Sequence, residues 1–213
     1  MPTKQVTAAE LKELDPKRFE KEYWEWVSYS ALWDDWTESI EEMFKEDVAP
    51  FGARVESIEY NIGVYDTEAI FIGAVAFDEF MEAYKVEGVP LSELYPALYL
   101  AVCEDGSWVR VTSNYRRMGI HLDIREQVSI TNPVGIFSGL DLDAWAELVD
   151  EQWSACDLES HVRSFIDDKC GDLARDLQAE YEHLTSVEAF LESCEANEIT
   201  FELEIEDESE FCS

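Results

Sequence analysis

The last 38 residues of the chain, which begin at Asp176, contain thirteen carboxylates and no lysine or arginine. Two apolar patterns run through this acidic stretch. Apolar residues recur at helical spacing between Val187 and Cys194, and they alternate with glutamates between Phe201 and Glu206. A disordered acidic tail has no such period. We therefore predict a folded segment with one buried face and one face that holds an ordered array of negative charge.

The same imbalance extends over the whole chain of 213 residues, in which 49 acids stand against 15 bases and the net charge is -34. Self-repulsion of this size opposes compaction. Two explanations are open: adaptation to high salt, or a partner that requires the charge. Seven Trp, eleven Phe and five Cys are typical of a core built for ordinary salt, so we favour a partner.

The cysteines and the apolar runs indicate where the protein works. The five cysteines are widely spaced and contain no CxxC pair, which favours reduced thiols in a cytosolic protein. The N-terminus lacks the apolar region of a signal peptide. No apolar run approaches the roughly 20 residues of a membrane span, and anionic membrane surfaces would repel the chain. We expect a cytoplasmic protein that does not bind membranes.

Periodicity predicts the elements of the fold. Thr7 and Glu10 form a capping-box pattern for a short first helix, and Thr185 and Glu188 form another that precedes a helix ending at Asn197. Three longer elements are helical by period: 31–47, 141–156 and 158–183. The expected strands are Val55–Ile62, Ala69–Phe77, Leu98–Cys103, Trp108–Thr112, Ile120–Ile124 and Ile199–Asp207.

From these elements we predict an α+β fold, in which an antiparallel sheet of about five or six strands packs against several acidic amphipathic helices. Residues 1–213 are expected to form a single domain. The best sub-boundary is the stretch rich in Gly and Pro near 137–139. It would separate the preceding residues from a helical part, 140–197, and a closing strand, 199–207.

Motifs of catalysis are absent from the sequence. There is no nucleophile elbow, phosphate-binding loop or cysteine signature. Asp157 with His161, and Glu180 with His183, have spacings that can hold a metal, but solvated helix faces explain them as well. We expect no enzyme, no catalytic residue, no metal and no cofactor.

A basic patch for direct nucleic-acid binding is also missing. The nearest approach is a set of four arginines, Arg110, Arg116, Arg117 and Arg125. In a chain of this charge we expect them to pair with local acids or to contact an acidic partner.

Three segments between Leu32 and Ala74 carry a resemblance: Leu32-Trp33-Asp34-Asp35-Trp36, the strand 55–62, and Ala69-Ile70-Phe71-Ile72-Gly73. They resemble a group of phage-encoded proteins known mainly as hypothetical, although Asp66-Thr67-Glu68 lacks the Gly-rich character usual at that loop. The match covers roughly a fifth of the chain and implies a phage or mobile-element source without any residue-level activity. In composition the chain is also similar to phage anti-restriction proteins that imitate DNA.

Imitation of nucleic-acid charge is our functional hypothesis. Duplex DNA carries one negative charge per roughly 1.7 Å of axis, so 34 charges correspond to about 58 Å of duplex. The chain would occupy the phosphate-binding groove of a basic host DNA-binding protein, such as a restriction or other defence nuclease. The expected contact residues are Asp34, Asp35, Glu38, Glu41, Glu42 and Glu46 in the first long helix, Asp143, Glu147, Asp150 and Glu151 in the second, and Glu202, Glu204, Glu206, Asp207 and Glu208 in and after the closing strand.

Two alternatives stay open. An antitoxin-like or adaptor protein would mask one basic partner without displacing DNA. An acid-rich enzyme or metal protein would depend on Asp157, His161, Glu180 and His183. A homodimer is compatible with each hypothesis.

Overall fold

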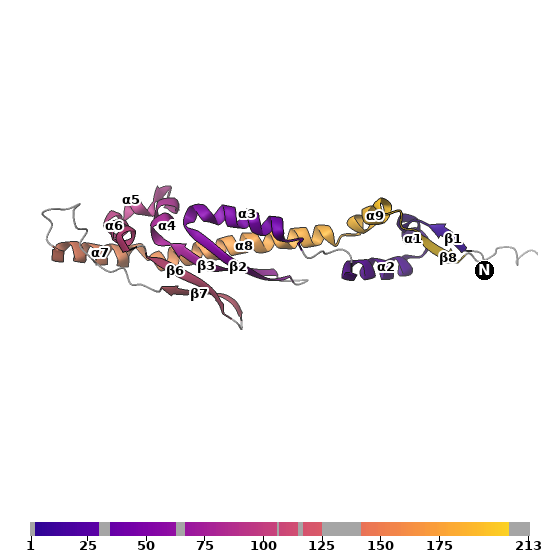
Figure 1. Cartoon of the computed structure of the whole chain (residues 1–213), viewed down its shortest axis with the longest axis horizontal. Coiled ribbons are helices and arrows are strands. Elements are labelled where there is room, and N and C mark those ends of the chain that lie inside the picture. The colour runs from indigo at the N-terminus through magenta and orange to yellow at the C-terminus, as the bar shows by residue number, and fades with distance from the viewer. Residues whose placement is uncertain are drawn as a thin grey trace, which may run out of the picture. The chain divides into compact units, whose positions relative to one another are not determined.

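The computed structural model describes residues 3–29, 35–62, 67–105, 107–114, 117–124 and 142–204, apart from some side chains near the gaps. The chain falls into two compact units. Unit 1 consists of Met1–Trp36 and Gln178–Ser213, and unit 2 consists of Thr37–Leu177. The elements of each are labelled in Figure 1.

Unit 1 joins segments from opposite ends of the sequence. Its elements are β1 (Thr3–Val6), α1 (Ala8–Leu14), α2 (Pro16–Tyr29), the end of α8 (Leu158–Leu184), α9 (Val187–Ala196) and β8 (Phe201–Glu204). β1 and β8 pair antiparallel, with Gln5 opposite Glu202. Leu11 and Phe19 meet Phe190 in one buried cluster, and the rings of Phe19 and Phe190 lie 5.5 Å apart.

The predicted capping box at the start of α1 is confirmed. The Thr7 hydroxyl accepts a hydrogen bond from the Glu10 backbone N–H at 3.2 Å, and the Glu10 carboxylate accepts one from the Thr7 N–H at 2.8 Å. The second predicted box is wrong by one residue. Ser186, not Thr185, caps α9 by accepting from the Ala189 N–H, whereas the Thr185 hydroxyl donates back to the Tyr181 carbonyl.

Unit 2 combines a sheet with helices. Its elements are α3 (Glu38–Val48), a short 3-10 helix (Ala49–Phe51), β2 (Ala53–Ile62), β3 (Thr67–Ala76), α4 (Phe77–Ala83), β4 (Lys85–Val86), β5 (Val89–Pro90), α5 (Leu91–Leu94), α6 (Pro96–Asp105), β6 (Trp108–Asn114), β7 (Arg117–Ile124), α7 (Leu142–Cys156) and most of α8.

The main sheet is antiparallel with the strand order β2-β3-β6-β7. One face carries Phe71 and Val75, which are fully buried. Phe44 of α3 lies 5.8 Å from the Phe71 ring, and Phe165 of α8 lies 4.6 Å from the Phe51 ring that follows α3. The core of unit 2 therefore sits between this face of the sheet and two long helices.

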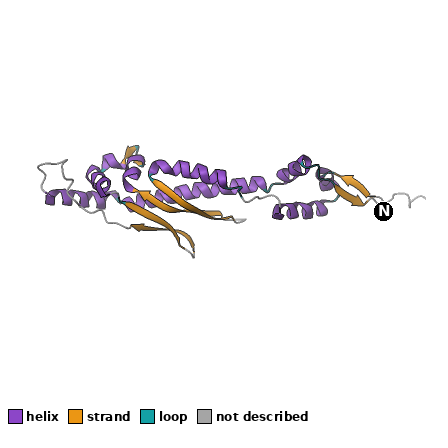
Figure 2. Cartoon of the chain, viewed as in Figure 1, coloured by secondary structure: helices purple, strands orange, loops and turns teal. Residues whose placement is uncertain are grey.

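The predicted fold class is wrong. The described residues are mostly helical, the largest sheet has four strands, and no sheet of five or six strands is present among them (Figure 2). Leu98–Cys103, predicted as a strand, lies in α6, because a short continuous apolar run suits a buried helix as well as a buried strand. The predicted closing strand is limited in the description to β8, which pairs with β1 rather than with the main sheet.

Other predictions stand as follows. The strands predicted at Val55–Ile62 and Ala69–Phe77 are present as β2 and β3, which pair antiparallel, and the helices α7 and α8 are present near their expected bounds. The helix predicted at 31–47 begins at Glu38 in the described residues, and 30–34 lie outside them. The stretch at 137–139 also lies outside the description.

Candidate acidic interface

α3 presents a straight row of three glutamates. Glu38, Glu42 and Glu46 are all exposed, while Phe44 and Val48 are buried on the other side of the helix. Residues four apart lie about 6 Å apart along a helix axis. No ion pair of these three is found among the described residues. Their neighbour Glu41 is half-buried, accepts a hydrogen bond from the Thr37 hydroxyl at 3.0 Å and lies 3.8 Å from the Lys45 ammonium.

α7 carries a second row. Asp143, Glu147, Asp150 and Glu151 are exposed, and Trp145 and Val149 are buried beneath them. The helix is held in place by Gln152, whose side-chain oxygen accepts from the backbone N–H groups of Ala97 and Leu98 at 2.9 and 3.1 Å. Gln152 thus caps α6, whose first N–H groups have no partner within that helix.

β8 alternates as its sequence predicts. Glu202 and Glu204 are exposed, and Phe201 and Leu203 pack against the buried cluster of unit 1. Glu202 already has neighbours: its carboxylate accepts from the Gln5 amide at 3.3 Å, and its carbonyl accepts from the Arg18 guanidinium. Of the β8 acids, Glu204 is therefore more accessible to a partner than Glu202.

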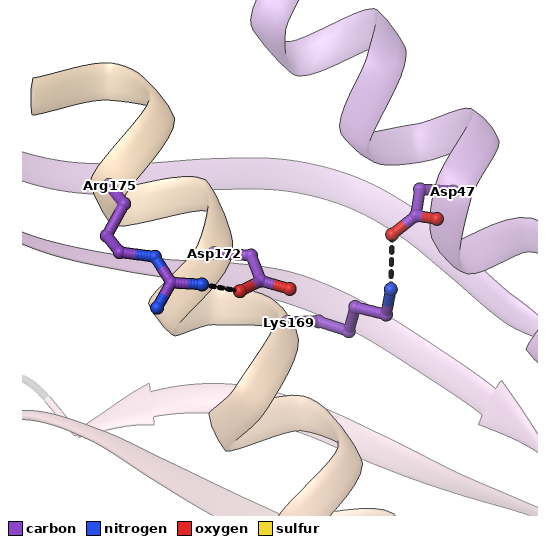
Figure 3. A network of polar contacts seen from close by, with 4 residues as sticks. All are labelled: Asp47, Lys169, Asp172 and Arg175. Carbon is purple, nitrogen blue, oxygen red and sulfur yellow. Dashed lines mark hydrogen bonds and ion pairs between the residues drawn. The ribbon is translucent and has the colours of Figure 1, made fainter. Parts of the chain in front are cut away.

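Several bases of unit 2 form ion pairs with nearby carboxylates. Lys169 of α8 pairs with Asp47 of α3, and Arg175 pairs with Asp172 one turn away on α8 (Figure 3). Arg110, one of the four arginines noted in the sequence, lies 3.4 Å from Glu56. Because these cations already face carboxylates, they add little positive charge near the acidic rows.

The predicted contact residues are divided between the two units. Glu38, Glu42 and Glu46 belong to unit 2, as do the four acids of α7, but α3 packs on β2 whereas α7 packs on α6. Asp35 is exposed just before α3 and belongs, like Glu202 and Glu204, to unit 1. Glu41 also belongs to unit 2, and the other four, Asp34, Glu206, Asp207 and Glu208, lie outside the described residues. The structure thus shows separate rows, each on its own element.

Two apolar side chains of these helices are exposed, although helical spacing places them on the apolar face. Met43 of α3 is 67% exposed and Leu148 of α7 is 41% exposed. Both fit the apolar period of their helices, but the neighbouring elements do not reach them. Asp167 and Asp168 were not among the predicted contact residues, although both are exposed on α8. Their outward spacing along the helix is of the same kind as that of the acids of α7.

The thiols in the described residues have raised pKa values, chiefly because burial disfavours the thiolate. Burial raises the pKa values of Cys156 and Cys170 to about 11, so both remain protonated near neutral pH. Cys103 is exposed, and partial burial raises its pKa as well. The hydroxyl of its neighbour Tyr99 donates to the Glu82 carboxylate, which raises the Tyr99 pKa. A thiolate nucleophile needs the opposite shift.

In the described parts of the chain, no three His, Cys, Asp or Glu side chains are grouped as metal ligands. His161, one half of a predicted ligand pair, has its ring 5.4 Å from that of Tyr84. Among the described helices, none combines the length and the hydropathy of a membrane-spanning segment. No family model, no curated protein and no solved structure matches the chain.

Proposed function

We propose that the chain is a non-enzymatic acidic protein that occupies the phosphate-binding groove of a basic DNA-binding protein, such as a restriction or other defence nuclease. The observation that carries the proposal is the row on α7, where four exposed carboxylates stand over a buried apolar face. Such charges are ordered before binding, so less conformational entropy is lost on association than with a disordered acidic tail.

The distance between successive carboxylates in a row can be compared with the spacing of phosphates in DNA. Asp143 to Glu151 spans about 12 Å of helix axis. One DNA strand places about 3.5 phosphates along that length, and the duplex about seven charges. The four carboxylates of α7 match one strand, and the three of α3 come close to it. Each row therefore imitates the phosphates of a single strand, and a groove that contacts one backbone is the target that suits it.

A displacement assay tests the proposal. Purified restriction nucleases are mixed with a short fluorescent duplex, and the chain is titrated in at low and at high salt. We expect the duplex to be released, and the affinity to fall steeply as salt rises. Replacement of Glu38, Glu42 and Glu46 together by Gln should weaken competition by about 10-fold to 100-fold, since each pair contributes roughly 0.5–1 kcal/mol.

The matched control is the triple variant E13Q/E20Q/E25Q in unit 1, which removes three exposed acids with the same change in net charge. Equal losses in the two variants would mean that net charge alone acts, and that the row on α3 has no special part. Failure to displace the duplex from any nuclease that the chain binds would contradict occupation of the groove.

The second candidate is an adaptor that masks one basic protein without competing with DNA. Exposed Met43 and Leu148 favour it, because a row of phosphates offers no apolar contact and these side chains do. Met43→Gln and Leu148→Gln separate the two candidates: an adaptor should lose affinity in both, whereas a mimic should lose little.

A further inference from the structure

A groove of about 440 Å³ in unit 1 takes no part in the proposed function. It lies among α1, α9 and the turn that leads to β8. Ala9, Leu191 and Ile199 form much of its wall, and Glu195 and Glu198 are its charged groups. Its volume falls within the roughly 300–1,000 Å³ of ligand pockets. The space suits the side chain of one large aliphatic residue and the backbone beside it.

The turn after α9 fixes one wall. The Ile199 N–H donates to the Cys194 carbonyl at 2.8 Å and the Glu198 N–H donates to the Glu195 carbonyl at 3.2 Å, which together form a Schellman motif. Glu198 takes the left-handed position of the motif, with φ 52°, where glycine is usual. Ile199 follows it and stays 41% exposed in spite of its apolar side chain.

The two charged residues that line the groove are both acidic. Glu195 and Glu198 are exposed, and no ion pair of either is found among the described residues. No lysine or arginine occurs in the sequence after Arg175. The groove therefore combines an apolar wall with two carboxylates, so its charge complement is a cationic segment with an apolar anchor.

We propose that this groove binds a short basic peptide segment in which one large aliphatic side chain is flanked by lysine or arginine. The aliphatic side chain fills the groove, and its flanking cations meet Glu195 and Glu198. A second copy of this chain suits the groove poorly, because its net charge of -34 repels the two carboxylates. The inference goes beyond the proposed function, since it requires neither the row on α3 nor the row on α7.

The test titrates the full chain into a fluorescent peptide of lysine and arginine with one central leucine, and follows anisotropy. A control peptide carries serine in place of the leucine. We expect the leucine peptide to bind at least about 10-fold more tightly, because burial of a leucine side chain is worth that much or more. Equal affinities would overturn the proposal and indicate a purely electrostatic attraction.

Variants of the chain locate the site. E195Q/E198Q should weaken binding of the leucine peptide by about 10-fold, whereas E188Q/E192Q, with two other exposed acids of α9, should change it little. Ala9→Phe should fill the groove and remove the preference for leucine at unchanged charge. Should that variant fail to fold, Ile199→Ser must reduce the same preference. An unchanged preference in a folded variant would place the peptide elsewhere.

These outcomes are independent of the displacement assay. A preference for leucine together with a failure to release duplex DNA would support the groove and contradict only the mimicry of DNA. Release of the duplex with no preference for leucine would do the reverse.

Discussion

Carboxylates occupy backbone positions that normally favour other residues. Glu87, Asp157 and Glu198 are the non-glycine residues with positive φ in the described parts of the chain, with φ values of 51°, 46° and 52°. Glycine is the usual residue there, and asparagine and aspartate adopt this conformation more readily than glutamate. Asp157 therefore suits its position, whereas Glu87 and Glu198 are glutamates where glycine or asparagine would be less strained.

The backbone strain caused by a glutamate at positive φ can be measured at Glu87. Glu87 and Gly88 connect β4 to β5 with φ values of 51° and 86°, which fits a two-residue turn that favours Asn-Gly. Glu87→Asn should raise the free energy of unfolding by about 0.5–1 kcal/mol, as measured by urea denaturation. Glu87→Gln removes the charge but keeps the strain. An equal gain in that variant would attribute the effect to charge repulsion.

The capping box at Glu10 predicts a pH dependence. The hydrogen bond from the Thr7 backbone N–H holds the pKa of Glu10 below its usual value. A carboxyl with a lowered folded-state pKa stabilises the fold above its unfolded pKa of about 4.3, and this stabilisation is lost as the pH falls through the folded value.

Glu10→Gln should therefore be less stable than the wild type at pH 7, and the difference should shrink at about pH 3. Urea denaturation at the two pH values measures it. Glu13→Gln, on the same helix but outside the capping box, is the control. A loss of the same size and pH dependence in Glu13→Gln would show that the cap is not the cause.

Among the elements, the β2–β3 pairing depends on one close approach. A Cβ at Gly73 would lie 2.0 Å from the Arg54 carbonyl oxygen, beside the irregularity in register between Val55 and Ser57. Backbone atoms cannot move aside as a flexible side chain does. Gly73→Ala should therefore lower the free energy of unfolding by about 3 kcal/mol or more.

Gly171→Ala is a control for Gly73→Ala, because it should change the free energy of unfolding in the opposite direction. It lies within α8, and a Cβ there would meet nothing within 4 Å. Gly171→Ala should raise the free energy of unfolding by up to about 1 kcal/mol, because alanine favours a helix over glycine. Thermal or urea denaturation of both variants measures the contrast, and a mild effect at Gly73 would contradict the close approach.

For the whole molecule, the excess of acids predicts how stability responds to salt. The described ion pairs, such as Lys169 with Asp47, hold bases against nearby acids and leave the surplus carboxylates to repel one another. Salt shortens the Debye length from about 30 Å at 0.01 M to about 3 Å at 1 M. The melting temperature, followed by circular dichroism, should rise over that range while the chain stays folded at its lower end. Unfolding at low salt would support adaptation to high salt instead of a partner.

The sequence by itself determined where the exposed acids of α7 lie. In α7 the apolar period buries Trp145 and Val149, so the acids on the opposite face of the helix, such as Glu147 and Asp150, are exposed. The capping box at Thr7 was equally local, since its residues are three positions apart. These features depend on contacts within one element, and a periodic pattern records such contacts directly.

Only the tertiary structure decided which elements meet. The pairing of β1 with β8 joins residues such as Gln5 and Glu202 across nearly the whole chain, and no pattern in either strand specifies the other. The same holds for Leu148, which has the period of a core residue but is left exposed. Burial of a side chain depends on a neighbour from elsewhere in the chain. The division of the acidic residues into distinct rows has the same origin, because long-range packing of its apolar face fixes the position of each helix.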